Sequence, residues 1–216
     1  MSEKLAGENE QPFAAAPRAW QRMLSGRRLD LLQPSPADIE IADIAHGLAR
    51  VARWNGQTLG EHAFSVAQHC LVVEEIARDT AAADGIAWHR EDALAALLHD
   101  APEYVVGDLI SPFKAAIGFD YKAFEIRLLR AVHARFGLPA VLSSAIAGRI
   151  KAADGTAAYF EATVLAGFTQ DEAALYFSPP PQLTPALRHH LESLEAWPTR
   201  VAQQRFLSRF QELHAA

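Results

Sequence analysis

Four ionisable side chains occupy positions where the sequence pattern predicts apolar helix faces. His69 has valines three and four positions away, and Asp154 has an isoleucine and two alanines at the same spacings. His99 and Asp100 stand side by side at the end of the apolar run "ALAALLHD". Residues three and four apart share a helix face, so we expect all four side chains to point into apolar surroundings.

Buried carboxylates need a positive partner. An isolated carboxylate in the core costs roughly several kcal/mol unless it is paired or bound to a metal. Apart from Arg149 and Lys151, no nearby basic residue is expected to face the same way. Two histidines and two carboxylates form a mixed nitrogen and oxygen donor set that suits Mn, Fe, Co, Ni or Zn. The pattern therefore predicts a site for one divalent transition-metal ion.

Each residue has a simpler explanation when it is taken alone. A single inward histidine, such as His69, is usually a hydrogen-bonded core residue, and an adjacent His-Asp pair can mark a helix end. The four residues fall on three separate predicted helices. Their joint occurrence is what favours the metal site.

The elements that would carry these residues are all helical. Pro102 disfavours the helical conformation in the preceding residue, so we expect the helix to break at His99 and Asp100 and to restart through Glu103. No run alternates with a period of two, and no internal repeat is present, so the fold class is predicted to be all-α. The predicted helices lie within residues 33–54, 62–79, 90–118, 120–137, 143–167 and 186–216.

Composition limits the classes of protein and partner. With 216 residues, half of them hydrophobic, the chain fits one domain at 19–216 behind a flexible tail at 1–18. A net charge of -6 without a dense Lys/Arg run argues against a nucleic-acid polymer as partner, whereas a small phosphorylated ligand stays open. The single cysteine, Cys70, and the lack of a signal or membrane-spanning pattern lead us to expect a cytoplasmic protein.

Five short sequence motifs connect these residues to a known family. "RW", "SVAQH", "LLHDAPEYVVGD", "SPFK" and "IKAAD" follow one another between about Arg53 and Phe168. Together they resemble the HD-domain metal-dependent phosphohydrolases, and more closely the bacterial 5′-deoxynucleotidases among them. The bare pattern H…HD…D is loose, but "HDAPE" followed by "GD" makes it specific. The resemblance implies a single helical HD domain.

The resemblance also implies a ligand set. One metal ion would be held by His69, His99, Asp100 and Asp154. His62, in "GEH", resembles a histidine of some relatives and competes with His69 for the role of first ligand. We favour His69 because its interval from the arginine of "RW" resembles that of the family; His62 could instead contact the substrate.

Further roles follow from the same resemblance. Glu103 would take part in proton transfer, and Asp108 would contact the sugar or the leaving oxygen. Arg53 would orient the phosphate, for which a guanidinium fork is well suited. Trp54 would stack on a nucleobase, and Lys114 is a weaker phosphate ligand. Without the resemblance, these residues would be a helix-start acid, a cap, a surface arginine, a core aromatic and a surface lysine.

The activity implied is hydrolysis of a phosphate ester by a metal-activated water. The expected substrates are small nucleotides, foremost deoxynucleoside 5′-monophosphates. A deoxynucleoside triphosphate triphosphohydrolase using the same metal site is the alternative, and a non-catalytic nucleotide-binding module is a third. The wider superfamily's cyclic-nucleotide and alarmone hydrolases fit less well, because the additional histidines of a two-metal site are missing. Similar enzymes are dimers, and the amphipathic C-terminal segment predicts a homodimer.

Overall fold

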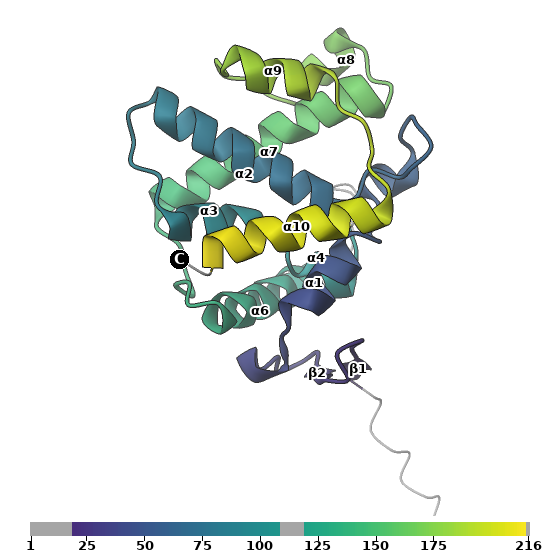
Figure 1. The fold of residues 1–216 in the computed structure, drawn as a ribbon, viewed down its shortest axis with the longest axis vertical. Helices are drawn as coiled ribbons and strands as arrows, with labels where there is room; N and C mark the ends of the chain where they lie inside the picture. Colours follow the sequence, from purple (N-terminus) through teal and green to yellow (C-terminus); the bar gives the residue numbers. More distant parts are fainter. Residues whose placement is uncertain (1–18, 109–118, 215–216) are drawn as a thin grey trace, which may run out of the picture.

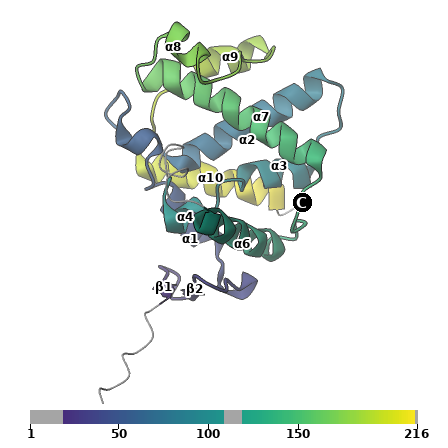
Figure 2. The same cartoon turned by 180° about the vertical axis from the view of Figure 1, so that it is seen from behind.

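The computed structural model describes residues 19–108 and 119–214. In chain order the described elements are β1 (Trp20–Arg22), β2 (Arg28–Asp30), η1 (Pro36–Asp38), α1 (Ile41–Leu48), η2 (Arg53–Gly56), α2 (Val66–Ala83), α3 (Arg90–Leu97), α4 (Glu103–Val106), α6 (Phe119–Arg135), α7 (Ser144–Phe160), the π-helical η3 (Glu161–Leu165), α8 (Gln170–Ala174), α9 (Pro185–Glu192) and α10 (Thr199–His214). Helices α3, α7, α9 and α10 all pack against α2, with α7 and α10 crossing it on opposite sides (Figures 1 and 2). The predicted all-α fold is confirmed.

Helix α2 is the central element because it is buried on nearly every side. Ser65 caps its start, where the hydroxyl accepts a hydrogen bond from the Gln68 amide at 3.3 Å. Every residue from 66 to 74 is buried. A helix that is buried all round must lie in the middle of the bundle. Polar residues on this helix therefore face other elements and need partners there.

The predicted break at the His-Asp pair is confirmed. Helix α3 ends at Leu97, the chain turns through residues 98–102, and α4 begins at Glu103. The Glu103 amide donates to the Asp100 carbonyl at 3.0 Å, so the turn passes directly into the first turn of α4. His99 and Asp100 are thus held at a fixed turn between two short helices. The break frees both side chains from the constraint of a single helix face.

A close approach of two helices fixes α4. Gly47 of α1 faces Tyr104 of α4, and a Cβ atom at position 47 would lie 2.7 Å from the Tyr104 Cβ. Only glycine fits at this contact, because real Cβ atoms do not come so close. Residue 104 follows Glu103, so the contact sets the position of that buried carboxylate.

Three segments differ from the sequence predictions. Strands β1 and β2 form a two-stranded antiparallel sheet that pairs Gln21 with Leu29, and strands of three residues are too short for a period of two to be recognised. The helix expected after Pro36 starts later, because η1 ends in extended backbone at Ile39. The C-terminal segment forms two helices, α9 and α10, with Pro198 just before the second.

The apolar face of α10 is used inside the chain. Its residues Ala202, Phe206, Phe210 and Leu213 are buried against the bundle. This face was the reason for expecting a homodimer, so the homodimer stays a prediction without that support. Among the helices described, none combines the length and apolar character needed to cross a membrane.

Candidate metal centre

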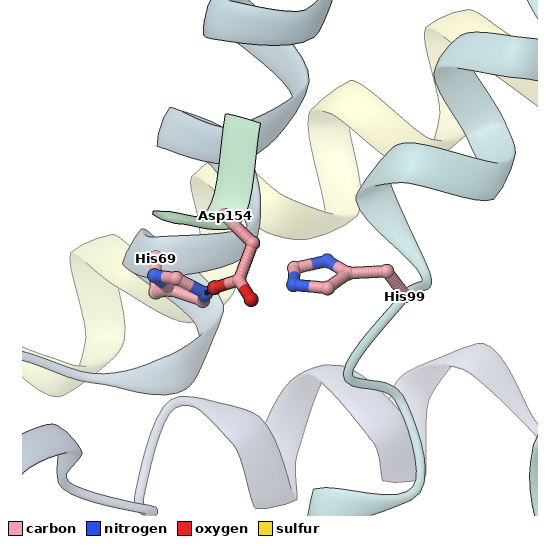
Figure 3. A group of neighbouring side chains, drawn as sticks. All are labelled: His69, His99 and Asp154. Carbon is pink, nitrogen blue, oxygen red and sulfur yellow. Dashed lines mark ion pairs between the residues drawn. The ribbon is translucent and has the colours of Figure 1, made fainter. Parts of the chain in front are cut away.

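The four predicted ligands converge on one point. His69 Nε2 lies 3.2 Å from an Asp154 carboxylate oxygen and 3.5 Å from one of Asp100, and His99 Nε2 lies 3.2 Å from the same Asp100 oxygen. In Figure 3 the Asp154 carboxylate points into the space between the two imidazole rings, whose centroids are 5.3 Å apart. Residues from α2, α7 and the turn after α3 thus meet although they are far apart in sequence.

The distances fit a metal ion. Bonds of about 2.0–2.2 Å in a tetrahedral arrangement place neighbouring ligand atoms about 3.3–3.6 Å apart. The separations of 3.2 to 3.5 Å at this cluster are close to that range. The Nε2 atoms of His69 and His99 are buried and make no hydrogen bond within the described residues. Buried ring nitrogens are normally hydrogen-bonded, so two without a partner beside carboxylates fit the ligand atoms of a metal ion.

Exposure differs among the ligands. The His69 side chain is fully buried, whereas Asp154 keeps 42% of its side chain exposed. Asp100 and His99 are intermediate. The predicted burial is therefore complete for His69 and partial for the other three, and the His69 ring nitrogens face carboxylates rather than apolar groups. A site with one closed side and one open side can hold an ion and still admit a ligand.

The pKa shifts in the cluster favour charged histidines beside ionised aspartates. Burial opposes a charge on each histidine, yet the neighbouring carboxylates raise the pKa of His69 and that of His99 well above the usual range. Burial would raise the pKa of Asp100 and Asp154, but the two histidines lower both. A divalent cation bound here would replace these protons as the positive partner of the aspartates.

Glu161 is a candidate site residue that the sequence reasoning missed. It is fully buried, and one of its oxygens lies 2.5 Å from His69 Nδ1. Burial alone would raise the pKa of Glu161, but the Arg53 guanidinium and His69 hold it at about 2. Glu161 stands seven positions after Asp154, about two helical turns along the same face. That spacing is the signal that could have identified it.

Arg53 and Trp54 lie on the far side of Glu161. The Arg53 guanidinium approaches the second Glu161 oxygen at 3.2 Å and an Asp108 oxygen at 3.4 Å. Trp54 Nε1 donates to that second Glu161 oxygen at 2.9 Å, and its rings pack edge-on against Phe168 and Phe177. Trp54 adopts a positive φ of 56°, a strained backbone that local contacts must hold. Burial opposes the charge of Arg53, but four neighbouring carboxylates, led by Glu161 and Asp108, raise its pKa.

The remaining predicted site residues are less closely tied to the cluster. Glu103 is buried at the start of α4, three positions after Asp100. His62 lies half-buried in the loop before α2, outside the group of neighbouring histidines and carboxylates that could hold a metal ion. The structure therefore brings His69, and not His62, to the cluster. Lys114 lies outside the described residues.

One solved structure has a similar fold. The structure resembles the cyanophage S-2L HD phosphohydrolase (DatZ) bound to dA and one catalytic Zn²⁺ ion, with a TM-score of 0.51 and 18% identity, over 82% of this chain and 97% of that one. At this identity the likeness is one of fold, and the fold is that of the HD-domain phosphohydrolases.

Sequence comparison gives the family. The chain is 55% identical over 191 residues to the uncharacterized protein RCAP_rcc00048 of Rhodobacter capsulatus, covering 81% of this chain and 95% of that protein. This chain therefore belongs to the same family as the Rhodobacter protein. It is also 30% identical over 125 residues to the uncharacterized protein YfdR of Escherichia coli K12, covering 58% of this chain and 62% of YfdR. No family model matches the sequence.

Proposed function

We propose that the protein is a metal-dependent phosphohydrolase that removes phosphate from deoxynucleoside 5′-monophosphates. The observation that carries the proposal is the cluster in which ligand atoms of His69, His99 and Asp154 lie within 4.8 Å of one another, with an Asp100 oxygen 3.2 Å from His99 and 3.5 Å from His69. The fold shared with a phosphohydrolase that binds dA and Zn²⁺ supports both the reaction and the nucleotide substrate.

The four ligands would hold one divalent ion of the Mn, Co, Fe, Ni or Zn group. Bound there, such an ion supplies Lewis acidity toward a water molecule and a phosphoryl oxygen. The chain supplies the open side of the site, because the Asp154 side chain is 42% exposed. His69 closes the other side, where water is excluded.

Arg53 and Asp108 would orient the substrate. A guanidinium pairs with two phosphate oxygens at once, and Arg53 is already held in place by Glu161 and Asp108. An arginine fixed in this way loses little side-chain entropy when it binds a phosphate. Asp108 would contact the sugar or the leaving oxygen next to it. Trp54 would pack against the nucleoside, with its indole N–H already engaged by Glu161.

Glu103 would carry the proton. It is a buried carboxylate in the first turn of α4, joined to the ligand turn by the hydrogen bond from its amide to the Asp100 carbonyl. A carboxylate that is partly desolvated accepts a proton more readily than one in water, because burial disfavours its charged form. In this role Glu103 would take a proton from the attacking water and deliver one to the leaving oxygen.

The number of cations near the site distinguishes a monophosphatase from a triphosphatase. A triphosphate needs further cations for its distal phosphates. Arg53 forms ion pairs with Asp108 and Glu161 beside the predicted ligands. Release of intact triphosphate remains the competing outcome of the test.

The test is product analysis by ³¹P NMR. Protein stripped with a chelator is reloaded with Mn²⁺, Co²⁺ or Zn²⁺ and incubated with matched deoxynucleoside mono- and triphosphates. We expect inorganic phosphate from the monophosphates, lost in Asp100→Asn. Asp84→Asn is the matched control, because Asp84 pairs with Arg149 away from the ligands. Intact triphosphate released from triphosphates would replace the proposal by the alternative, and no product with any metal would refute both.

A further inference from the structure

Glu161 divides its two carboxylate oxygens between two groups of residues. Oε1 lies 2.5 Å from Nδ1 of His69, a predicted metal ligand. Oε2 receives the Trp54 indole N–H at 2.9 Å and the Arg53 Nε–H at 3.2 Å. The carboxylate has no exposed surface, so these neighbours replace water as its donors. One buried side chain therefore touches both the metal-ligand cluster and the residues beside it.

The contact with His69 fixes the tautomer of the imidazole. An ionised carboxylate only accepts hydrogen bonds, so Nδ1 must carry a proton. When Nε2 loses its proton to bind a metal, its lone pair points to the side of Asp100 and Asp154, as a metal ligand requires. Helix α7 and its π-helical continuation thus hold both nitrogens of one ring, Nε2 through Asp154 and Nδ1 through Glu161.

His99 is oriented by different means. Its Nδ1 lies 2.9 Å from the backbone carbonyl of Ala96, one turn earlier in the chain. No side-chain substitution removes that acceptor. The orientation of His69, in contrast, depends on the Glu161 side chain, which lies 92 positions later in the sequence.

We propose that Glu161 is a positioning residue that links the metal half of the site to the Arg53–Trp54 half. When Oε1 orients His69 for the ion, Oε2 of the same rigid group sets the directions of the Trp54 and Arg53 donors. Binding of the ion therefore shifts the environment of the Trp54 indole through Glu161. Only the description of Arg53 and Trp54 as the substrate side rests on the proposed function.

A change of Glu161 to glutamine separates this role from simple space filling. The amide has nearly the same shape but one acceptor oxygen in place of two. It cannot accept from His69 Nδ1 and from Trp54 and Arg53 together, and its NH₂ group must face one of these donors. Glu74→Gln is the matched control, since Glu74 is an equally buried acid of α2 that pairs with Arg209.

Metal affinity is measured first, by titrating metal-stripped protein with Zn²⁺ in a calorimeter. We expect Glu161→Gln to weaken Zn²⁺ binding by about 10- to 100-fold, the usual effect of losing a partner of a ligand histidine. Glu74→Gln should bind Zn²⁺ like the wild type. This readout needs no substrate, so it separates a failure of this proposal from a failure of the proposed activity.

The link is measured by ¹⁵N NMR of the indole N–H groups. The chain has four tryptophans, and the Trp54 signal is identified by its loss in Trp54→Phe. In the wild type, Zn²⁺ should shift the Trp54 signal but not that of Trp20, which packs on Arg22 and Arg28 near the N-terminal sheet. In Glu161→Gln saturated with Zn²⁺, the shift should be lost.

Two results would overturn the proposal. One is wild-type Zn²⁺ affinity in a folded Glu161→Gln protein, with folding checked by circular dichroism. The other is a Trp54 signal in the wild type that does not respond to saturating Zn²⁺, which decides the matter even if the glutamine variant does not fold.

Discussion

Helix α2 carries two buried acidic centres that are stabilised in different ways. At Glu74, one carboxylate oxygen accepts from Arg209 at 2.9 Å and from Arg78 at 3.3 Å, while the other accepts from Arg209 at 3.2 Å. At His69, five positions earlier, Asp100 and Asp154 pair with imidazoles, and among the described residues no ion pair joins either aspartate to an arginine or lysine. Arg53 lies on the other side of His69 and pairs with Glu161 and Asp108 instead. The Glu74 centre is therefore complete within the chain, whereas Asp100 and Asp154 depend on the imidazole protons or on a bound cation.

The difference separates a structural ion pair from a binding site. Arginine offers a permanent positive charge with fixed donors, so the Glu74 centre has no need of a ligand. The histidine cluster exchanges its positive charge with the solvent, because its protons can leave when an ion arrives. Burial of charge therefore does not by itself indicate a binding site. A partner that can lose its positive charge, such as histidine, is the more informative feature.

The largest expected effect comes from removing a ligand of the histidine cluster. Asp100→Asn keeps the shape of the side chain and removes one negative charge. Residues that only support a metal ligand typically change activity by about 10- to 100-fold. We expect phosphatase activity to fall by more than this in Asp100→Asn. Steady-state assays with saturating Mn²⁺ or Zn²⁺ measure the effect. Activity within tenfold of wild type would mean that the two centres do not differ as described.

Removing the main basic partner of Glu74 tests the other buried centre, which we interpret as structural. Arg209→Ala leaves Glu74 buried with Arg78 alone, and Arg78 is about half exposed. We expect the free energy of unfolding to fall by about 3 kcal/mol, because a buried charge loses its main partner. Activity per folded molecule should stay at the wild-type level. Urea denaturation followed by circular dichroism, together with the phosphatase assay, gives both numbers.

A rise in pH should weaken the stabilisation that protonated histidines give the metal-free protein, and it should strengthen the stabilisation by bound metal. Because the pKa values of His69 and His99 are raised, their contribution to the stability of the metal-free protein is complete below the unfolded-state value of about 6.5 and is lost at higher pH. The lowered pKa values of Asp100 and Asp154 add stability above about 3.9, which is lost in acid.

The ion should stabilise the protein more as the histidines lose their protons. At a free concentration 100 times Kd, bound metal adds about 2.7 kcal/mol. The thermal shift produced by a fixed Zn²⁺ concentration should therefore be larger at pH 8 than at pH 5.5, and absent in Asp100→Asn. An equal shift at both pH values would contradict the exchange of protons for metal.

The smallest expected effect comes from moving helix α4 without changing any charge. Gly47→Ala places a Cβ 2.7 Å from the Tyr104 Cβ, so α4 must move. We expect a loss of about 1–3 kcal/mol in stability and a lower kcat, because Glu103 moves with the helix. Gly148→Ala in α7 is the control, since nothing lies within 4 Å of its added Cβ. It should be neutral or stabilising by up to about 1 kcal/mol. Equal losses in both variants would show that the contact is unimportant.

Local spacing made most of the ligand set predictable. His69 and Asp154 interrupt apolar helix faces, and Pro102 predicts the break that frees His99 and Asp100. The structure brings the four together as that pattern indicates. Glu161 was missed because its importance depends on a contact with a ring 92 positions away. Its spacing of seven residues from Asp154 is compatible with the same helix face, but spacing alone does not show that it lies opposite His69.

Other parts of the fold were harder to predict for local reasons. The strands around Gln21 and Leu29 are three residues long, shorter than any periodic signal. The C-terminal segment has helical spacing on both sides of Pro198, so the break between α9 and α10 was overlooked. Packing of Phe206 and Phe210 inside the bundle could not be distinguished by pattern from an intermolecular surface.

The most direct test of the central claim is a calorimetric titration of metal-stripped protein with Zn²⁺ at pH 8, in two buffers of different ionisation enthalpy. The account predicts one ion bound per chain, release of protons on binding, and loss of binding in Asp100→Asn. Absence of binding, or unchanged affinity in Asp100→Asn, would contradict the identification of the histidine cluster as a metal centre.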